Sequence, residues 1–248
     1  VKKSRSPLLP VDSEHSAVFQ CMERAGQKPK RIILTASGGA FRGKTAEELK
    51  NAGYASALAH PTWSMGEKIT IDSATMFNKT LEVIEAKWLF GLETDKIDIL
   101  IHPQSTVHSM AEFDGGTILG QVYPPTMLEP IGYALSYPAE PRHIREIDLS
   151  ENGFEFSQPD KKNFPCVTLA YDGIMAPPLM PAVMNGANET CVEMFRQNQL
   201  CFTDFWNIIH STCEHFYREL TRTELTVPNI VLFDLLAKQY AERLIRKG

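Results

Sequence analysis

A helix predicted from about Thr75 to Phe90 carries the most distinctive polar groups of this 248-residue chain. Asn78 and Glu82 are four residues apart and Glu85 follows three later, so an amide and two carboxylates share one helical face. Apolar residues cover most of the remaining circumference, which predicts a buried helix. Because buried polar groups need partners, this face is a candidate site for an ion or a polar ligand.

The segment before this helix, residues 57–67, predicts a binding loop or lid. It combines an imidazole, an indole and a thioether, at His60, Trp63 and Met65, with proline and with Gly66. A short β-branched run at residues 68–72 follows it and reaches Ser73, just before the predicted helix.

A second group of acids stands near the start of the chain, where Asp12, Ser13, Glu14 and His15 precede a helix predicted over residues 16–24. If a strand ends at Val11, the two carboxylates point to one side. The alternative is a helix N-terminus, where acids are simply favoured by the helix dipole. Both readings stay open from the sequence.

A third candidate is the turn Ser37-Gly38-Gly39, which follows a predicted buried strand over residues 31–36. Its hydroxyl and backbone amides could hold an anion, although Gly-Gly after a strand is also an ordinary turn. Thr45 and Glu48 then form a capping box that opens a helix to about Ala52.

The combined residue types indicate one chemistry. Three carboxylates, without paired His or Cys ligands, suit a hard cation such as Mg²⁺ or Mn²⁺. Serines, an asparagine and Lys79 suit a phosphate group. Together they predict a metal-assisted site for a phosphosugar, where the cation polarises hydroxyl and carbonyl oxygens.

Composition narrows the class of protein. The chain is 43% hydrophobic and 22% charged, as in globular proteins, and its net charge of −5 argues against nucleic acid as a partner. No apolar run reaches the length of a membrane span, and no signal peptide opens the sequence. The five cysteines lack CxxC spacing, which predicts reduced thiols and a cytoplasmic location.

The order of predicted elements gives an α/β (α+β) catalytic domain followed by a small C-terminal helical bundle. Strands over 97–102 and 107–123, the latter a hairpin around Asp114-Gly115-Gly116, precede a helix over 126–137. We expect a metal- and phosphosugar-binding domain at 1–138, a linker at 139–165 and a helical domain at 166–248. The bundle helices are predicted over 166–175, 181–198, 203–217 and 229–246. Residues 185–189, NGANE, indicate close helix packing and no catalytic role.

Several segments together resemble the 1-deoxy-D-xylulose 5-phosphate reductoisomerase family. They are LLPVDSEH at 8–15, TASGGAFR at 35–42, HPTWSMGEKITIDSATMFNKTLEVIEAKWLF at 60–90, IHPQSTVHSM at 101–110 and NGANE at 185–189. The resemblance implies rearrangement of the sugar skeleton and reduction by NADPH, giving 2-C-methyl-D-erythritol 4-phosphate for non-mevalonate isoprenoid biosynthesis. It also implies Mn²⁺ or Mg²⁺, or Co²⁺, as the metal, and a homodimer.

The resemblance assigns roles residue by residue. Asp12, Glu14 and Glu82 are similar to the metal ligands, and Glu14, Glu82 and His60 to the catalytic residues. The residues similar to substrate contacts are Ser13, Glu14, Ser37, His60, Trp63, Met65, Ser73, Asn78, Lys79 and Glu82. Gly66 resembles a position that approaches NADPH, and Glu85 one that orients a ligand. His15 and His108 match histidines near the site without a defined role, whereas His102 is expected to be structural.

The sequence also departs from the family pattern. No Gly-x-Gly-x-x-Gly fingerprint for a dinucleotide occurs in the chain, and the sequence does not begin with Met. We therefore expect a portion of the enzyme that lacks the N-terminal NADPH-binding domain and cannot reduce the substrate alone. Two alternatives remain, a non-catalytic dimerisation or scaffold unit and a nucleotide-independent metal-dependent sugar-phosphate isomerase or aldolase.

Overall fold

The computed structural model describes residues 6–139, 147–148 and 153–247, apart from the side chain of Ile174. Within it the chain forms two compact units, each built from two separate stretches. Unit 1 comprises residues 1–37 and 82–159, and unit 2 comprises residues 38–81 and 160–248. The expected boundaries at residues 138 and 165 stay a prediction, and part of the expected linker lies outside the described residues.

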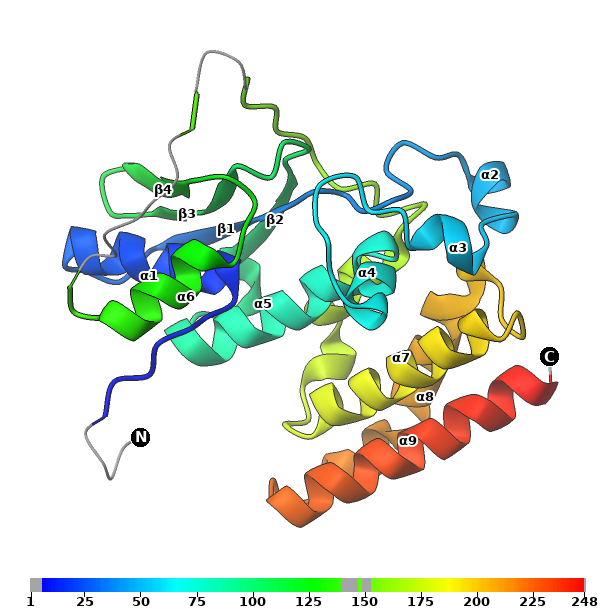
Figure 1. Cartoon of the computed structure of the whole chain (residues 1–248). Helices are drawn as coiled ribbons and strands as arrows, with labels where there is room; N and C mark the ends of the chain where they lie inside the picture. The colour runs from blue at the N-terminus through cyan, green and yellow to red at the C-terminus, as the bar shows by residue number, and fades with distance from the viewer. Residues whose placement is uncertain (1–5, 140–146, 149–152, 248) are drawn as a thin grey trace. The chain divides into compact units, whose positions relative to one another are not determined.

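Unit 1 contains a four-stranded mixed sheet with the order β2-β1-β3-β4 (Figure 1). Strand β1 (Arg31–Ala36) pairs in parallel with β2 (Ile97–Ile101) and antiparallel with β3 (Val107–Glu112). Strand β4 (Ile118–Val122) completes the predicted hairpin with β3. The turn uses Gly115 and Gly116 at φ +88° and +83°, values that favour glycine. All four strands therefore confirm the sequence prediction.

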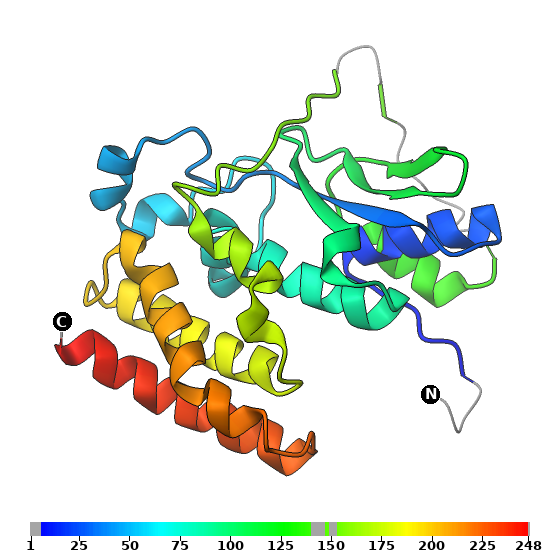
Figure 2. The same ribbon diagram turned by 180° about the vertical axis from the view of Figure 1, so that it is seen from behind.

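Helix α1 (Ser13–Ala25) packs on the β3–β4 hairpin and also contacts α6 (Leu128–Ser136), as Figures 1 and 2 show from opposite sides. Cys21 from α1 meets Ala111 and Phe113 in a small apolar cluster, which explains why this face of α1 is buried. The second half of α5 (Phe77–Phe90) lies beside α1, where Phe90 stacks on His15. A 3₁₀ turn, Thr94–Lys96, leads into β2.

Unit 2 begins with the turn after β1 and continues through α2 (Ala46–Lys50), α3 (Tyr54–Ala57), α4 (Glu67–Ala74) and the first half of α5. The predicted capping box is present, with Thr45 and Glu48 bonded reciprocally. The β-branched run at residues 68–72 forms α4, a helix that the sequence analysis does not predict. Thr70, Ile71 and Asp72 are buried together with Ala74, and Lys68 pairs with Asp72 one turn away.

A sharp bend joins α4 to α5 at Met76, a buried residue with φ +64°. Left-handed backbone is unusual for a side chain of this size. Because of this bend, α4 ends at Ala74 and α5 begins at Phe77 as a separate helix.

The rest of unit 2 is helical. Three 3₁₀ segments, Pro165–Tyr171, Gly173–Met175 and Phe202–Asp204, accompany α7 (Met180–Arg196), α8 (Phe205–Leu220) and α9 (Val227–Lys247). Helices α7 and α9 lie side by side in both views (Figures 1 and 2). Gly186 permits this, since a Cβ there would stand 2.7 Å from the carbonyl oxygen of Asp234. The α/β fold with a C-terminal helical bundle is confirmed.

All five cysteines are free, and four of them are buried. Burial raises the pKa of the Cys21 thiol to about 11. In the part of the chain that the structure describes, no helix has both the length and the apolar character needed to cross a membrane.

Candidate metal and phosphate sites

Three carboxylates of unit 1 converge, as predicted. Asp12 precedes α1, Glu14 is in its first turn, and Glu82 is on α5. One oxygen of each lies within 4.8 Å of the others. Glu82 is 2% exposed, and the Asp12 side chain is 39% exposed. We call Asp12, Glu14 and Glu82 the carboxylate cluster.

The backbone that carries two of these acids is a helix start and not a strand end. Helix α1 begins at Ser13, so the reading in which Val11 ends a strand is wrong. Acids are favoured at this position by the dipole of the helix. The Asp12 side chain makes no capping hydrogen bond to a backbone N–H of the first turn, so its carboxylate faces the cluster and His15 instead.

His15 ties the two helices of the cluster together. Its Nε2 donates to the Glu82 carbonyl oxygen at 2.9 Å, while Nδ1 faces Asp12 at 3.4 Å and Glu85 at 3.8 Å. Burial lowers the pKa of His15, but the hydrogen bond and charge of Asp12 and the charge of Glu85 outweigh it and raise this pKa above its ordinary value. A ring held in this way fixes where the neighbouring carboxylates lie.

A second histidine, His108, is connected to Ser13 through Tyr123. The Ser13 hydroxyl donates to Glu14 at 2.6 Å, and the Tyr123 hydroxyl donates to the Ser13 carbonyl at 3.5 Å. Tyr123 stacks on His108 with ring centroids 3.7 Å apart. Burial lowers the pKa of His108, which favours the neutral ring. Tyr123 is absent from the predicted site, because a tyrosine ending a strand carries no local signal of this contact.

His102 has the structural role that the sequence suggests. Its Nδ1 donates to the Glu155 carbonyl at 3.0 Å, and its Nε2 lies 3.1 Å from the Thr106 hydroxyl. The ring is fully buried and stacks on Phe156. With both nitrogens engaged inside the protein, His102 has no atom left for a ligand.

In unit 2, the predicted phosphate-binding residues Ser73, Asn78 and Lys79 lie at the α4–α5 bend, and we call them the phosphate cradle. Lys79 is 6% exposed, and an ammonium group at that depth favours an anionic neighbour. Gly39 packs directly on this bend, because a Cβ there would meet the Ser73 carbonyl oxygen at 2.4 Å. The Gly-Gly turn thus supports the backbone of the cradle. Ser37, half-buried, ends the first stretch of unit 1.

After the buried Ala57, the lid residues lie at the surface of unit 2, where Trp63 and Met65 are half-buried and Gly66 is the exposed N-cap of α4. His60 accepts the backbone N–H groups of Thr62 at 3.2 Å and Trp63 at 2.9 Å through Nδ1. Burial and the charge of Arg42 lower the pKa of His60. The neutral ring therefore carries its proton on Nε2, where it can act as a donor.

The chemistry of the carboxylate cluster fits a hard divalent cation. Its donors are all carboxylate oxygens, which Mg²⁺ and Mn²⁺ prefer, and they come from two helices held by His15. Like charges this close disfavour one another's ionised form, and a cation between them removes that cost. Asp12, His15 and Glu85 form an overlapping group that shares Asp12.

Comparison with known proteins identifies the family of the chain. A model of the 1-deoxy-D-xylulose 5-phosphate reductoisomerase C-terminal domain matches residues 8–90, and a model of the DXP reductoisomerase C-terminal domain matches residues 122–240. The chain belongs to the 1-deoxy-D-xylulose 5-phosphate reductoisomerase family. The reductoisomerase of Clostridium acetobutylicum is 48% identical over 233 residues, which are 92% of this chain and 60% of the relative. That of Geobacter metallireducens is 46% identical over 248 residues, 99% of this chain and 64% of the relative.

Solved reductoisomerase structures have the same fold. A crystal structure of DOX-P reductoisomerase in complex with NADPH, fosmidomycin and magnesium matches with a TM-score of 0.89 at 35% identity, over 99% of this chain and 65% of that one. The Zymomonas mobilis reductoisomerase in complex with NADPH gives a TM-score of 0.87 at 38% identity, over 99% and 63%. The chain thus spans less than two thirds of the length of these reductoisomerases.

Proposed function

We propose that this chain is the metal- and phosphosugar-binding portion of an NADPH-dependent reductoisomerase. The reaction would rearrange 1-deoxy-D-xylulose 5-phosphate and reduce the product to 2-C-methyl-D-erythritol 4-phosphate, in non-mevalonate isoprenoid biosynthesis. The observation that carries the proposal is the convergence of the Asp12, Glu14 and Glu82 carboxylates within 4.8 Å. Membership of the family, and neighbours whose names include NADPH, fosmidomycin and magnesium, support it.

In this proposal Asp12, Glu14 and Glu82 hold Mg²⁺ or Mn²⁺, with Co²⁺ as a further candidate. The bound ion would polarise hydroxyl and carbonyl oxygens of the sugar. Ser13, whose hydroxyl donates to Glu14, would contact a substrate hydroxyl at the same place. Glu14 and Glu82 are then both ligands and part of the catalytic machinery, while His15 and Glu85 keep the carboxylates in position.

The phosphate group of the substrate would be held by Ser73, Asn78 and Lys79 of unit 2. Lys79 contributes a point charge and the other two contribute neutral hydrogen bonds. The substrate contact assigned to Ser37 by the resemblance stays a prediction. His60, with its proton on Nε2, would donate to the substrate from the lid. Trp63 and Met65 would cover the substrate and nicotinamide and exclude water, with Gly66 close to NADPH.

Titration with Mn²⁺ tests the proposal, followed by calorimetry or by the electron paramagnetic resonance signal of the free ion. The wild-type chain should bind one ion, and Glu82→Ala should lower the affinity at least 100-fold. Glu93→Ala is a matched control, since it removes an exposed carboxylate of the same unit that pairs with Lys87. Equal Mn²⁺ affinity in wild type and Glu82→Ala would rule out this assignment.

A second function, dimerisation through unit 1, is favoured by the exposed edge of the sheet. Strand β4 has β3 as its only neighbour among the described strands, and its residues Ile118 and Val122 are 47% and 36% exposed. An apolar edge strand of this kind invites pairing with a second copy of the chain. Sedimentation should give a dimer for the wild type and a monomer for Val122→Lys. A wild-type monomer at micromolar concentration would contradict this role.

A further inference from the structure

The NGANE segment, residues 185–189, is a quoted motif to which the proposed function gives no task. It lies on α7, where Asn188 is fully buried and Asn185 and Glu189 are partly buried. Polar side chains on the buried face of a helix lower stability unless they have partners. The partners of this segment therefore indicate what it does.

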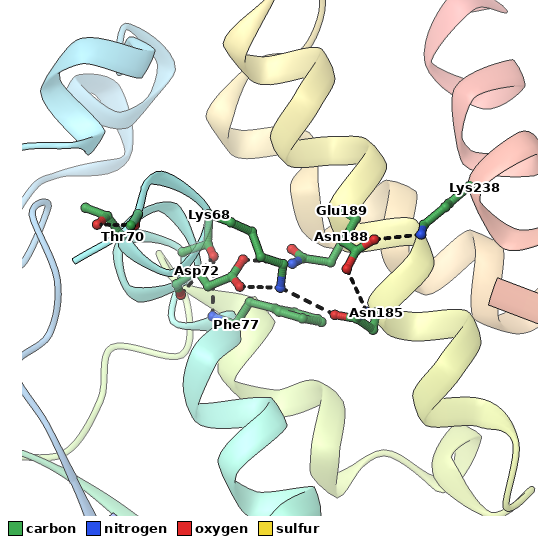
Figure 3. A network of polar contacts seen from close by, with 10 residues as sticks. Lys68, Thr70, Asp72, Phe77, Asn185, Asn188, Glu189 and Lys238 are labelled. Carbon is green, nitrogen blue, oxygen red and sulfur yellow. Dashed lines mark hydrogen bonds and ion pairs between the residues drawn. The ribbon is translucent and has the colours of Figure 1, made fainter. Parts of the chain in front are cut away.

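The main partner is Asp72 on α4, a carboxylate that is only 1% exposed (Figure 3). Asn188 donates to Oδ1 of Asp72 at 2.7 Å, and Lys68 donates to Oδ2 at 2.7 Å. Burial raises the pKa of Asp72, while Lys68 and Asn188 oppose that effect. Both carboxylate oxygens are thus engaged by charge-assisted or amide hydrogen bonds, from two helices.

The contacts continue from α4 across α7 to α9. Lys68 also lies 3.4 Å from the Asn185 amide oxygen, and Asn185 donates to Glu189 at 3.1 Å. Glu189 pairs with Lys238 at 2.7 Å, and Lys238 pairs with Asp234 at 2.8 Å. Figure 3 shows the side chains of Lys68, Asn185, Glu189 and Lys238 directed toward one another. Acidic and basic groups alternate along these contacts, with the Asn185 amide between Lys68 and Glu189, and this pattern favours one register of the helices.

Apolar residues alone could bury α4 equally well, because replacing a buried ion pair by well-packed hydrophobic side chains is often neutral or stabilising. A hydrophobic contact has no direction, whereas the two bonds at Asp72 are lost if α4 slides or rotates on α7. Helix α4 has eight residues, and it lies between the lid and the cradle. Ser73 of the cradle is the next residue after Asp72.

We propose that Asp72 is a positioning residue which, with Lys68 and Asn188, fixes the register of α4 on α7 and so holds the phosphate cradle in its binding geometry. This inference rests on the proposed function, since it takes Ser73, Asn78 and Lys79 as the phosphate site. Asp72 itself does not touch the substrate. In this proposal the NGANE segment supports substrate binding indirectly, because α7 carries none of the proposed substrate-binding residues.

The test measures two ligands on the same purified chain, inorganic phosphate by ³¹P NMR or calorimetry and Mn²⁺ in separate samples. Asp72→Asn and Lys68→Met should each weaken phosphate binding about tenfold, the equivalent of one lost charge-assisted bond. Mn²⁺ affinity should stay within twofold, because the carboxylate cluster belongs to unit 1. Lys68→Arg should restore phosphate affinity to within threefold of the wild type, since the cation is kept.

Lys50→Met is the matched control, because it removes a lysine of unit 2 that pairs with Glu47 on the exposed face of α2. It should change neither affinity. Lys68 is 40% exposed, so Lys68→Met keeps the test valid if Asp72→Asn folds poorly. Unchanged phosphate affinity in both network variants would overturn the positioning role alone. A parallel loss of Mn²⁺ binding would overturn it as well, by revealing general damage, whereas a wild-type chain without phosphate affinity would overturn the proposed phosphate site itself.

Discussion

The carboxylate cluster of unit 1 and Asp72 of unit 2 are arranged in opposite ways. In unit 1, oxygens of Asp12, Glu14 and Glu82 converge on one another, within 4.8 Å. In unit 2, the oxygens of Asp72 are each met by a donor at 2.7 Å. The side-chain chemistry is the same, so the difference comes from what the neighbouring helices present to it.

This contrast separates binding from stability. A group of like charges costs folding free energy until a cation neutralises it, so the carboxylate cluster is arranged for a ligand. A paired carboxylate that is already hydrogen-bonded gains nothing from an added ion, and breaking its pairing leaves a buried charge. The first region should therefore respond to metal and the second to mutation.

Replacing one acidic residue in each region should give the largest difference in the free energy of unfolding. Asp72→Ala leaves Lys68 and Asn188 without their acceptor and should lower the free energy of unfolding by about 3–5 kcal/mol. Asp12→Ala, in buffer containing EDTA, should change it by less than about 1 kcal/mol, because that side chain is 39% exposed. Urea unfolding followed by circular dichroism measures both values. Equal costs would remove the distinction between the regions.

Added Mn²⁺ should stabilise the folded chain by an intermediate amount, through binding at the carboxylate cluster. At 100 times its dissociation constant, an ion that binds only the folded chain stabilises it by about 2.7 kcal/mol. The wild type and Asp72→Asn should both gain this stability, and Asp12→Asn should gain little. Thermal unfolding with and without Mn²⁺ provides the comparison, and stabilisation of Asp12→Asn equal to that of the wild type would argue against the cluster as the site.

Lowering the pH should have the smallest effect on stability, through protonation of His108. Burial lowers the pKa of this residue, so the folded chain holds it neutral while the unfolded chain protonates it near pH 6.5. Its contribution is complete above pH 6.5 and is lost as the pH falls from 6.5 toward the lowered value, at about 1.4 kcal/mol for each unit of lowering. Asp72 works in the opposite direction, because its pKa is raised and its protonation favours the folded chain.

The variant His108→Phe isolates this effect, because it keeps a ring against Tyr123 and removes the titrating group. Between pH 7 and pH 5 the wild type should lose more stability than His108→Phe. Parallel curves for the two proteins would show that His108 does not carry the acid dependence. The raised pKa of His15, present in both proteins, cancels from the difference.

Where local sequence determines local structure, the prediction from sequence is accurate. The strand β1 (Arg31–Ala36), the glycine turn of the hairpin and the Thr45–Glu48 capping box need only neighbouring residues to form, and all are present. The same holds for α7, α8 and α9 of the bundle, whose apolar spacing is visible in the chain, whereas the helix predicted over 166–175 is replaced by two 3₁₀ segments. The convergence of the three carboxylates follows from the resemblance to the family together with these elements.

Tertiary contacts explain the failures. Residues 68–72 have the β-branched composition of a strand, yet they form α4 because the helix lets Asp72 reach Asn188, which is 116 positions away in the sequence. Tyr123 meets Ser13 over a similar separation. No window of the sequence contains both partners of such a pair, so the pattern of neighbours cannot reveal it.

Met76, at the bend between α4 and α5, fixes the shape of the phosphate cradle. A glycine would adopt its φ of +64° without strain, but it would also leave the bend free to take other conformations. A methionine is confined there by its buried side chain, which is 3% exposed, at a backbone cost of about 1–2 kcal/mol. The angle between the two halves of the cradle is therefore set by an anchor in the core, and a ligand meets a surface that is already shaped before it arrives.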